Sequence, residues 1–142
     1  MSVYQVSVFT QSQPGHLLRI LETLAEHECN VRGFSCSDSG DFGIARFVLD
    51  DPNRAVSVLK DKGFAAALTE VIIFELHDTP GELQSVVSLL ANKGINIVYS
   101  YSLISTCVAI RVKEVDQAKQ LLADNGVALV TQAELTKRYQ RQ

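Results

Sequence analysis

Apolar and polar positions alternate along the chain in two different periods, and the order of those periods predicts its secondary structure. Residues 3–9 are apolar and β-branched, with strand-like alternation at Val6 and Val8. After Pro14, apolar residues recur at the i, i+3, i+4, i+7 spacing of one helix face; they are Leu17, Ile20, Leu21 and Leu24. The chain therefore begins with a strand followed by an amphipathic helix.

In the rest of the first half, strand-like and helix-like segments continue to follow one another. Residues 30–37 and 42–49 predict two strands that pair across a polar turn. Pro52 opens a second helix that ends at Gly63 and has Ala55, Val58 and Leu59 as its inward positions. A fourth strand at 64–68 completes the element order βαββαβ.

The second half of the chain repeats the first. Pro14-Gly15 recurs 66 residues later as Pro80-Gly81. The same offset relates Leu17 to Leu83, Leu24 to Leu90, Ala25 to Ala91 and Asn30 to Asn96. Further on the offset falls to 63, and it relates Ala55 to Ala118, Leu59 to Leu122 and Gly63 to Gly126. The chain is thus two copies of one unit of about 70 residues, one of which has lost three residues from a loop.

The second copy predicts the same elements as the first. They are a strand at 70–76, a helix at 80–93, strands at 95–103 and 106–113, a helix at 115–124 and a strand at 127–131. The first of these helices is expected to turn Leu83, Val86, Val87 and Leu90 to one face. Two split βαβ crossovers per copy predict an α+β fold of ferredoxin-like type, with an antiparallel sheet and both helices on one side.

The repeat also predicts the domain organisation. We expect one domain over 1–69 and a second over 70–142, the latter ending in a short C-terminal tail. Neither Pro nor Gly separates the copies between Phe64 and Leu76. Because a unit of about 70 residues is marginally stable alone, the copies are expected to pack as a pseudo-twofold pair.

Composition narrows the classes of function. Apolar residues make up 46% of the chain and the net charge is −3, which excludes a disordered chain and disfavours nucleic acid as a partner. No apolar stretch approaches the roughly 20 residues of a membrane span, and no secretory signal opens the sequence, so a cytoplasmic protein is expected. Cys29, Cys36 and Cys107 form no CxxC pair, which predicts small buried thiols rather than a disulfide or a metal site.

The repeated loop before the first helix carries most of the polar chemistry. In the second copy it reads HDTPGEL, in which Thr79 and Glu82 match a capping box and Pro80 sits at the favoured first helical position. Gly81 leaves room for a ligand or another backbone, and Asp78 stands outside the box, free to meet an amine. The first copy has lost these capping residues, so its helix N–H groups need another acceptor, either a bound carboxylate or water.

The strings QPGHLLRILETLAEHECNV and TPGELQSVVSLLANKGINI resemble the ACT domain, whose first helix follows a D-x-P-G-x-L loop and leads through Gly-Ile-Asn-Ile into the second strand. The resemblance covers the chain twice, up to about residue 131. The second copy keeps the pattern at Asp78, Pro80, Gly81, Leu83, Gly94, Asn96 and Ile97. The first copy departs from it at Ser12 and at Glu28-Cys29.

The resemblance implies a non-catalytic regulatory protein that binds a free amino acid between paired ACT-like domains, without a cofactor or metal. The helix-one loop of one unit and the start of strand two of the other then form the pocket. Carried over, one set is Ser12, Pro14, Gly15, His16 and Leu17 with Asn96 and Ile97, and the other is Asp78, Thr79, Pro80, Gly81 and Leu83 with Asn30 and Val31. Asn30 and Asn96 have an equal alternative, since Asn tolerates a left-handed turn before a strand.

Other classes with the same element order lack their signatures here. Acylphosphatases need an Arg in the first loop, and residues 10–16 contain none. RNA-recognition modules need exposed aromatic and basic residues on strands one and three, and TCVAIRV has no aromatic residue. A protein-binding subunit or adaptor of an amino-acid biosynthetic enzyme, without a ligand of its own, stays open. A homodimer is expected, because edge strands and helix faces remain to be paired.

Overall fold

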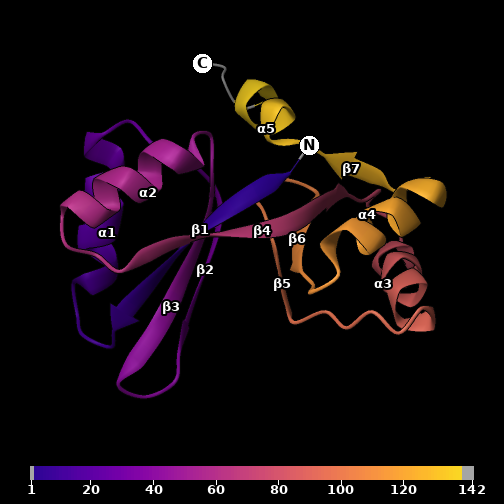
Figure 1. The fold of residues 1–142 in the computed structure, drawn as a ribbon, viewed down its shortest axis with the longest axis horizontal. Coiled ribbons are helices and arrows are strands. Elements are labelled where there is room, and N and C mark those ends of the chain that lie inside the picture. Colours follow the sequence, from indigo (N-terminus) through magenta and orange to yellow (C-terminus); the bar gives the residue numbers. More distant parts are fainter. Residues whose placement is uncertain (1, 139–142) are drawn as a thin grey trace. The chain divides into compact units, whose positions relative to one another are not determined.

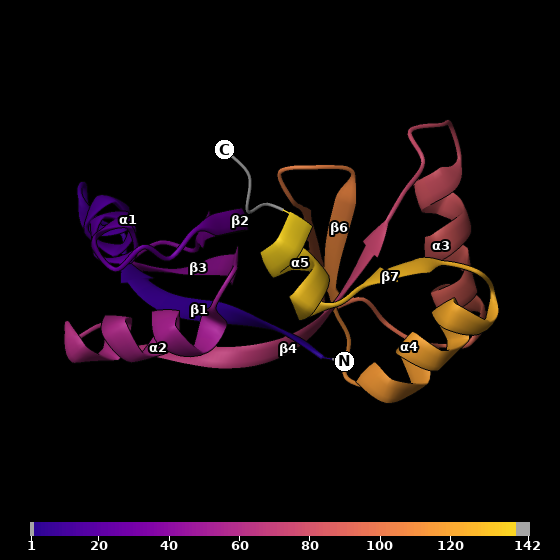
Figure 2. The ribbon, with the colours of Figure 1, turned by 90° about the horizontal axis from the view of Figure 1, so that it is seen from above.

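The computed structural model describes residues 2–138, which divide into two compact units. The N-terminal unit consists of Tyr4–Thr69 together with the described residues from Leu135 onward. The C-terminal unit consists of Glu70–Glu134 together with the described residues up to Val3. Each unit therefore contains a short piece from the opposite end of the chain. Figures 1 and 2 show the ribbon in two views.

The N-terminal unit has the predicted ferredoxin-like topology. Its elements are β1 (Val3–Gln11), α1 (His16–Glu26), β2 (Val31–Asp38), β3 (Phe42–Leu49), α2 (Pro52–Asp61) and the first part of β4 (Ala66–Glu75). The strand order is β2-β3-β1-β4, and β3 pairs antiparallel with both β1 and β2. The two crossover helices return the chain to the same face of this sheet, as right-handed connections require.

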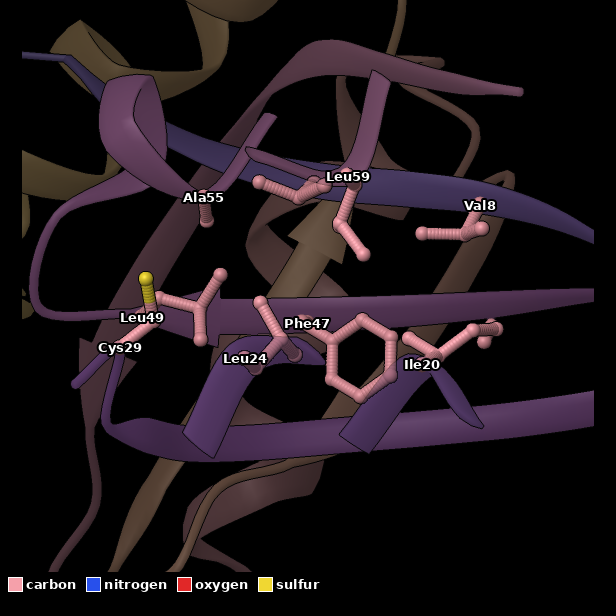
Figure 3. Close-up of a cluster of buried hydrophobic side chains, with 10 residues drawn as sticks. Val8, Ile20, Leu24, Cys29, Phe47, Leu49, Ala55 and Leu59 are labelled. Atoms are coloured by element: carbon pink, nitrogen blue, oxygen red, sulfur yellow. The ribbon is translucent and has the colours of Figure 1, made fainter. Parts of the chain in front are cut away.

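One layer of apolar side chains joins the sheet of the N-terminal unit to its two helices. Val8, Phe47 and Leu49 face the helices from β1 and β3, and α1 and α2 contribute Ile20, Leu24, Ala55 and Leu59 (Figure 3). All seven side chains are fully or almost fully buried. The i, i+3, i+4 spacing read from the sequence is therefore the stripe that binds α1 to the sheet.

The C-terminal unit repeats this arrangement. Its elements are the last part of β4, α3 (Glu82–Asn92), β5 (Tyr99–Ser102), β6 (Cys107–Arg111), α4 (Val115–Asp124) and β7 (Ala128–Val130), in the strand order β7-β4-β6-β5. Val86, Leu90, Ala118 and Leu122 form the helical side of its core. Of the four residues predicted to share one face of α3, Val86 and Leu90 are buried, whereas Leu83 and Val87 are 47% and 37% exposed. The buried stripe of α3 runs through Val86, Leu89 and Leu90, which leaves those two residues at its flank.

Strand β4 differs from the sequence prediction of two separate strands. It runs without a break from Ala66 to Glu75. Ala66 packs against the N-terminal core, while Ile72 and Phe74 belong to the C-terminal core. The absence of Pro and Gly between Phe64 and Leu76 permits this continuity. A single strand thus serves as the fourth strand of one unit and the first strand of the other.

The C-terminal residues form a helix, α5 (Gln132–Arg138), where the sequence predicted only a tail. The helix begins with a capping box. The Glu134 N–H donates to Thr131 Oγ1 at 3.1 Å, and the Thr131 N–H donates to Glu134 Oε1 at 3.0 Å. The string TQAE carries this signal in the sequence. Within residues 2–138, no helix is long and apolar enough to cross a membrane.

Candidate functional site

The two Pro-Gly loops share one backbone geometry although their side chains differ. Gly15 and Gly81 precede α1 and α3 with φ of 87° and 85°, in the left-handed region. In each loop the first helical N–H donates to the carbonyl three residues before it, at 3.3 Å. The fourth helical N–H then returns to the glycine carbonyl, at 3.0 Å in both. The glycine is retained because an L side chain rarely adopts this φ.

This geometry corrects the predicted capping box at Thr79. Helix α3 begins at Glu82, one residue after Gly81, and no side chain caps its N-terminus. Pro80 therefore lies in the turn before the helix rather than at its first position. The left-handed glycine turns the chain so that Thr79 uses its carbonyl, not its hydroxyl, to accept the Glu82 N–H. Thr79 and Glu82 are thus released from the capping role that the sequence predicted.

A cavity of about 520 Å³ lies beside this loop in the C-terminal unit. The loop between β4 and α3 forms one wall, and the turn between β5 and β6 forms the other. Four predicted site residues line it: Asp78, Thr79, Gly81 and Leu83. Three hydroxyl residues of the turn, Ser102, Ser105 and Thr106, face them across it. We name this cavity the C-terminal pocket.

The polar groups of the C-terminal pocket suit a zwitterion. Among the described residues, no side chain hydrogen-bonds or ion-pairs with the Asp78 carboxylate, which is exposed and able to meet an ammonium group. The first turn of α3 presents backbone N–H groups that lack an intrahelical acceptor, and the partial positive charge of the helix end attracts a carboxylate. An acid for the amine and N–H donors for the carboxylate therefore lie in one cavity.

The corresponding cavity of the N-terminal unit is smaller, about 290 Å³. We name it the N-terminal pocket. Ser12 and Pro14 line it from the loop and Leu17 from the first turn of α1, and Cys36, Ser37 and Asp38 line it from the end of β2, where the hairpin to β3 begins. Here the Ser12 hydroxyl donates to Asp38 Oδ2 at 2.5 Å, while Asp38 Oδ1 accepts the Gly40 N–H at 3.0 Å. The hairpin carboxylate is thus already engaged by the loop.

His16 lies apart from the N-terminal pocket and has a structural contact. Its Nδ1 accepts the Gln11 N–H at 3.0 Å, at the end of β1, and its ring lies 5.8 Å from the ring of Phe64. His16 lines a separate groove of about 630 Å³ with Arg19 and Lys62. Its contacts within the unit therefore close the loop onto the end of β1.

The Asn-led segments lie away from the loops of their own units. In the N-terminal unit, Gln11 pairs with Phe42, whereas Val31 pairs with Leu49, seven residues further along β3. At about 3.3 Å per residue this separation is about 23 Å. Asn96 and Ile97 likewise precede β5, whose first residue pairs with Arg111 at the far end of β6. These segments therefore do not reach the Pro-Gly loop of their own unit.

The left-handed-turn interpretation of the two asparagines is wrong. Neither Asn30 nor Asn96 has a positive φ. The left-handed residue of this turn comes two positions earlier, where Glu28 has φ 56° and its counterpart Gly94 has φ 71°. Asn30 is held instead by its N–H, which donates to Asp50 Oδ1 at 2.9 Å.

Two of the three cysteines are buried, as predicted. Cys29 and Cys107 are buried, whereas Cys36 is exposed on the edge strand β2. Burial, and after it the negative charge of Asp50, raises the pKa of the Cys29 thiol. Among the residues that the structure describes, no three His, Cys, Asp or Glu side chains gather to hold a metal ion.

Sequence reasoning missed the turn residues that complete both pockets. Asp38 in one unit and Ser102, Ser105 and Thr106 in the other come from hairpins that the loop motif does not include. The signal was present in the topology, because the ferredoxin-like order brings the first loop and the central hairpin to the same end of the sheet.

Two ferredoxin-like units, each with a Pro-Gly loop and an adjoining pocket, place this protein in the class of tandem ferredoxin-like folds. The chain belongs to the ACT domain pair family, which matches residues 1–139. ACT domain pairs are regulatory modules, and membership supports a regulatory, ligand-binding role for this chain. No protein of curated function matches the sequence.

Two solved structures are similar to this chain. Protein BT0572 from Bacteroides thetaiotaomicron is 31% identical and superposes with a TM-score of 0.90 over 96% of this chain and 97% of its own. The regulatory subunit of aspartate kinase from Thermus thermophilus is 17% identical, with a TM-score of 0.62 over 87% of this chain and 91% of that one. The second likeness concerns the fold, which is the predicted α+β ferredoxin-like pair.

Proposed function

We propose that this protein is a non-catalytic sensor that binds a free α-amino acid through its Pro-Gly loops and thereby regulates amino-acid metabolism. The observation that carries the proposal is the C-terminal pocket. It combines the unengaged carboxylate of Asp78 with the open N–H groups at the start of α3. An α-amino acid offers an ammonium and a carboxylate to these two kinds of group.

The charge of the pocket narrows the class of amino acid. Among the residues that the structure describes, Asp78 and Glu82 line it, whereas neither Lys nor Arg does. A ligand with an acidic side chain would bring a second negative charge to a wall that is already acidic. Neutral or basic amino acids therefore fit the pocket, and aspartate and glutamate do not.

The experiment that tests the function is a thermal-shift screen of the twenty amino acids. A ligand at 100 times its Kd stabilises the folded protein by about 2.7 kcal/mol, which is readily seen as a rise in Tm. We expect one or a few neutral or basic amino acids to raise the Tm. If no amino acid at millimolar concentration shifts the Tm or releases heat in calorimetry, the sensor function is wrong.

The Asn-led segments enter the proposal as further contributors. Because Asn30, Val31, Asn96 and Ile97 stand away from their own loops, they would contribute through a loop of another unit. Asn30→Ala and Asn96→Ala should lower the affinity for the ligand only if these residues contribute to binding in this way. Calorimetric titration of these two variants measures their contribution.

The proposed regulatory role also implies protein partners. Strands β2 and β5 each pair on one side only among the described residues, so both offer an edge to a second copy or another protein. A homodimer is proposed, and a particle of 15.6 kDa at every concentration in light scattering would contradict it. The likeness to a regulatory subunit motivates an amino-acid biosynthetic enzyme as the regulated partner.

A further inference from the structure

The two loop pockets have the same loop backbone but differ in what faces the loop. In the C-terminal pocket, the loop itself carries the acid, Asp78, and hydroxyl residues face it. In the N-terminal pocket the loop carries Ser12 instead, and the acid Asp38 comes from the hairpin. Ser12 is the counterpart of Asp78, 66 residues apart in the sequence. The carboxylate has therefore moved from one wall of the pocket to the other.

Hairpin length explains the difference. Cys36 pairs with Ala45 and Ser102 pairs with Val108, which are equivalent positions of the two sheets. Eight residues separate the first pair along the chain and five separate the second. The three additional residues let the N-terminal hairpin reach the loop, where Asp38 accepts the Ser12 hydroxyl at 2.5 Å. The shorter hairpin of the C-terminal unit leaves a cavity of about 520 Å³, against about 290 Å³.

The N-terminal pocket consequently disfavours binding of both the carboxylate and the ammonium group of an amino acid. A ligand carboxylate entering beside the loop would meet the negative charge of Asp38, and it would have to displace a charge-assisted hydrogen bond from Ser12. A ligand ammonium would find Ser12 where the other unit provides Asp78. We propose that each chain binds a single amino acid, in the C-terminal pocket, and that the Ser12–Asp38 contact closes the N-terminal pocket. This proposal rests on the proposed function.

Calorimetric titration of the full chain with the amino acid that gives the largest Tm rise tests it first. We expect one ligand per chain. Two ligands per chain would overturn single occupancy while leaving the sensor function intact. Absence of binding by all twenty amino acids would overturn the function itself, so the two failures are distinguishable.

A matched pair of substitutions then locates the site. Asp78→Asn should weaken binding about 10- to 100-fold, as expected for loss of a charged hydrogen bond. Asp38→Asn makes the same chemical change in the other pocket and should leave the affinity of the C-terminal pocket unchanged. The reverse pattern, in which Asp38→Asn weakens binding and Asp78→Asn does not, would overturn the assignment.

Amide NMR of the unaltered protein gives an answer that does not depend on the variants folding. Ligand should shift the amide signals of Leu83 and Gln84, at the start of α3, and leave those of Leu17 and Leu18, at the start of α1, in place. Comparable shifts at both helix starts, or shifts at α1 alone, would contradict single occupancy of the C-terminal pocket.

Discussion

At the scale of single residues, the two copies show how one backbone position constrains its side chain. The turn that follows α1 holds Glu28 at φ 56°, and the matching turn after α3 holds Gly94 at φ 71°. A left-handed conformation costs a side-chain-bearing residue roughly 1–2 kcal/mol, whereas glycine adopts it freely. The first copy therefore carries local strain that the second copy lacks.

Replacing Glu28 by glycine should relieve this strain. We expect Glu28→Gly to raise the free energy of unfolding by about 0.5–1 kcal/mol, because the released strain exceeds the greater freedom that glycine gives the unfolded chain. Urea denaturation measures the change. The reciprocal variant Gly94→Ala should lower stability by about 1 kcal/mol, since no atom crowds its Cβ and only the φ is unfavourable. Destabilisation by Glu28→Gly would show that the left-handed conformation of Glu28 does not strain the folded protein.

The cysteines allow a second prediction at this scale. Cys36 is exposed, whereas Cys29 is buried with its pKa raised by burial and by Asp50. A raised thiol pKa keeps Cys29 protonated at a pH where an ordinary thiol begins to ionise, and the thiolate is the reactive form. In the native protein at about pH 8, a thiol reagent should label Cys36 first and Cys29 only on unfolding. Mass spectrometry of the labelled peptides measures this order, and early labelling of Cys29 would contradict it.

At the scale of elements, the hairpin between β2 and β3 depends on a glycine that the sequence pattern did not single out. A Cβ on Gly43 would collide with the carbonyl oxygen of Ser37 and lie 2.8 Å from Thr10 Oγ1. Gly43 sits between β1 and β2 in the sheet, opposite Thr10 and Asp38. The close approach of three strands at this point holds Asp38 in reach of the loop.

Gly43→Ala should therefore destabilise the N-terminal unit. We expect a loss of about 1–3 kcal/mol, the usual result of overpacking, because the collision is with backbone rather than with a flexible side chain. Chemical denaturation measures the loss. Ser39→Ala, at an exposed position of the same hairpin, should change stability by less than about 0.5 kcal/mol. Equal effects of the two substitutions would show that the crowding around Gly43 does not affect stability.

Element boundaries show which features the sequence could predict. Periodicity located α1, α2 and α4 and the strands β2, β3 and β6, because burial of one face is a local pattern, whereas the strand predicted at 95–103 is confined to Tyr99–Ser102. The start of α3 was misplaced, since the left-handed Gly81 overrides the cap that Thr79 and Glu82 resemble. The pairing of Ser12 with Asp38 could not be read from either segment, because it depends on hairpin length and sheet register 26 residues apart. The loop half of each pocket was therefore predictable and the hairpin half was not.

At the scale of the whole molecule, the two units exchange their terminal segments. The described residues from Leu135 onward belong to the N-terminal unit, although 65 residues of the C-terminal unit, Glu70–Glu134, precede them. Leu135 is fully buried, and the Thr136 hydroxyl donates to the Asp50 carbonyl at 2.8 Å. At the other end, Ser2 hydrogen-bonds to Glu70, which also pairs with Lys119 at 3.5 Å. A cut between Thr69 and Glu70 would thus deprive each repeat of part of its unit.

This exchange predicts that a substitution near the C-terminus weakens the N-terminal unit. Leu135→Ala should lower the free energy of unfolding by about 2–3 kcal/mol, because it removes a fully buried leucine side chain. Hydrogen exchange should then lose protection at the Asp50 amide, which donates to the Asn30 carbonyl in that unit. Lys137→Ala, on the exposed side of α5, is the matched control and should be neutral within about 0.5 kcal/mol. If Leu135→Ala left stability and the Asp50 amide unchanged, the part of α5 from Leu135 onward would not belong to the N-terminal unit, and the repeat ending at Thr69 would be sufficient by itself.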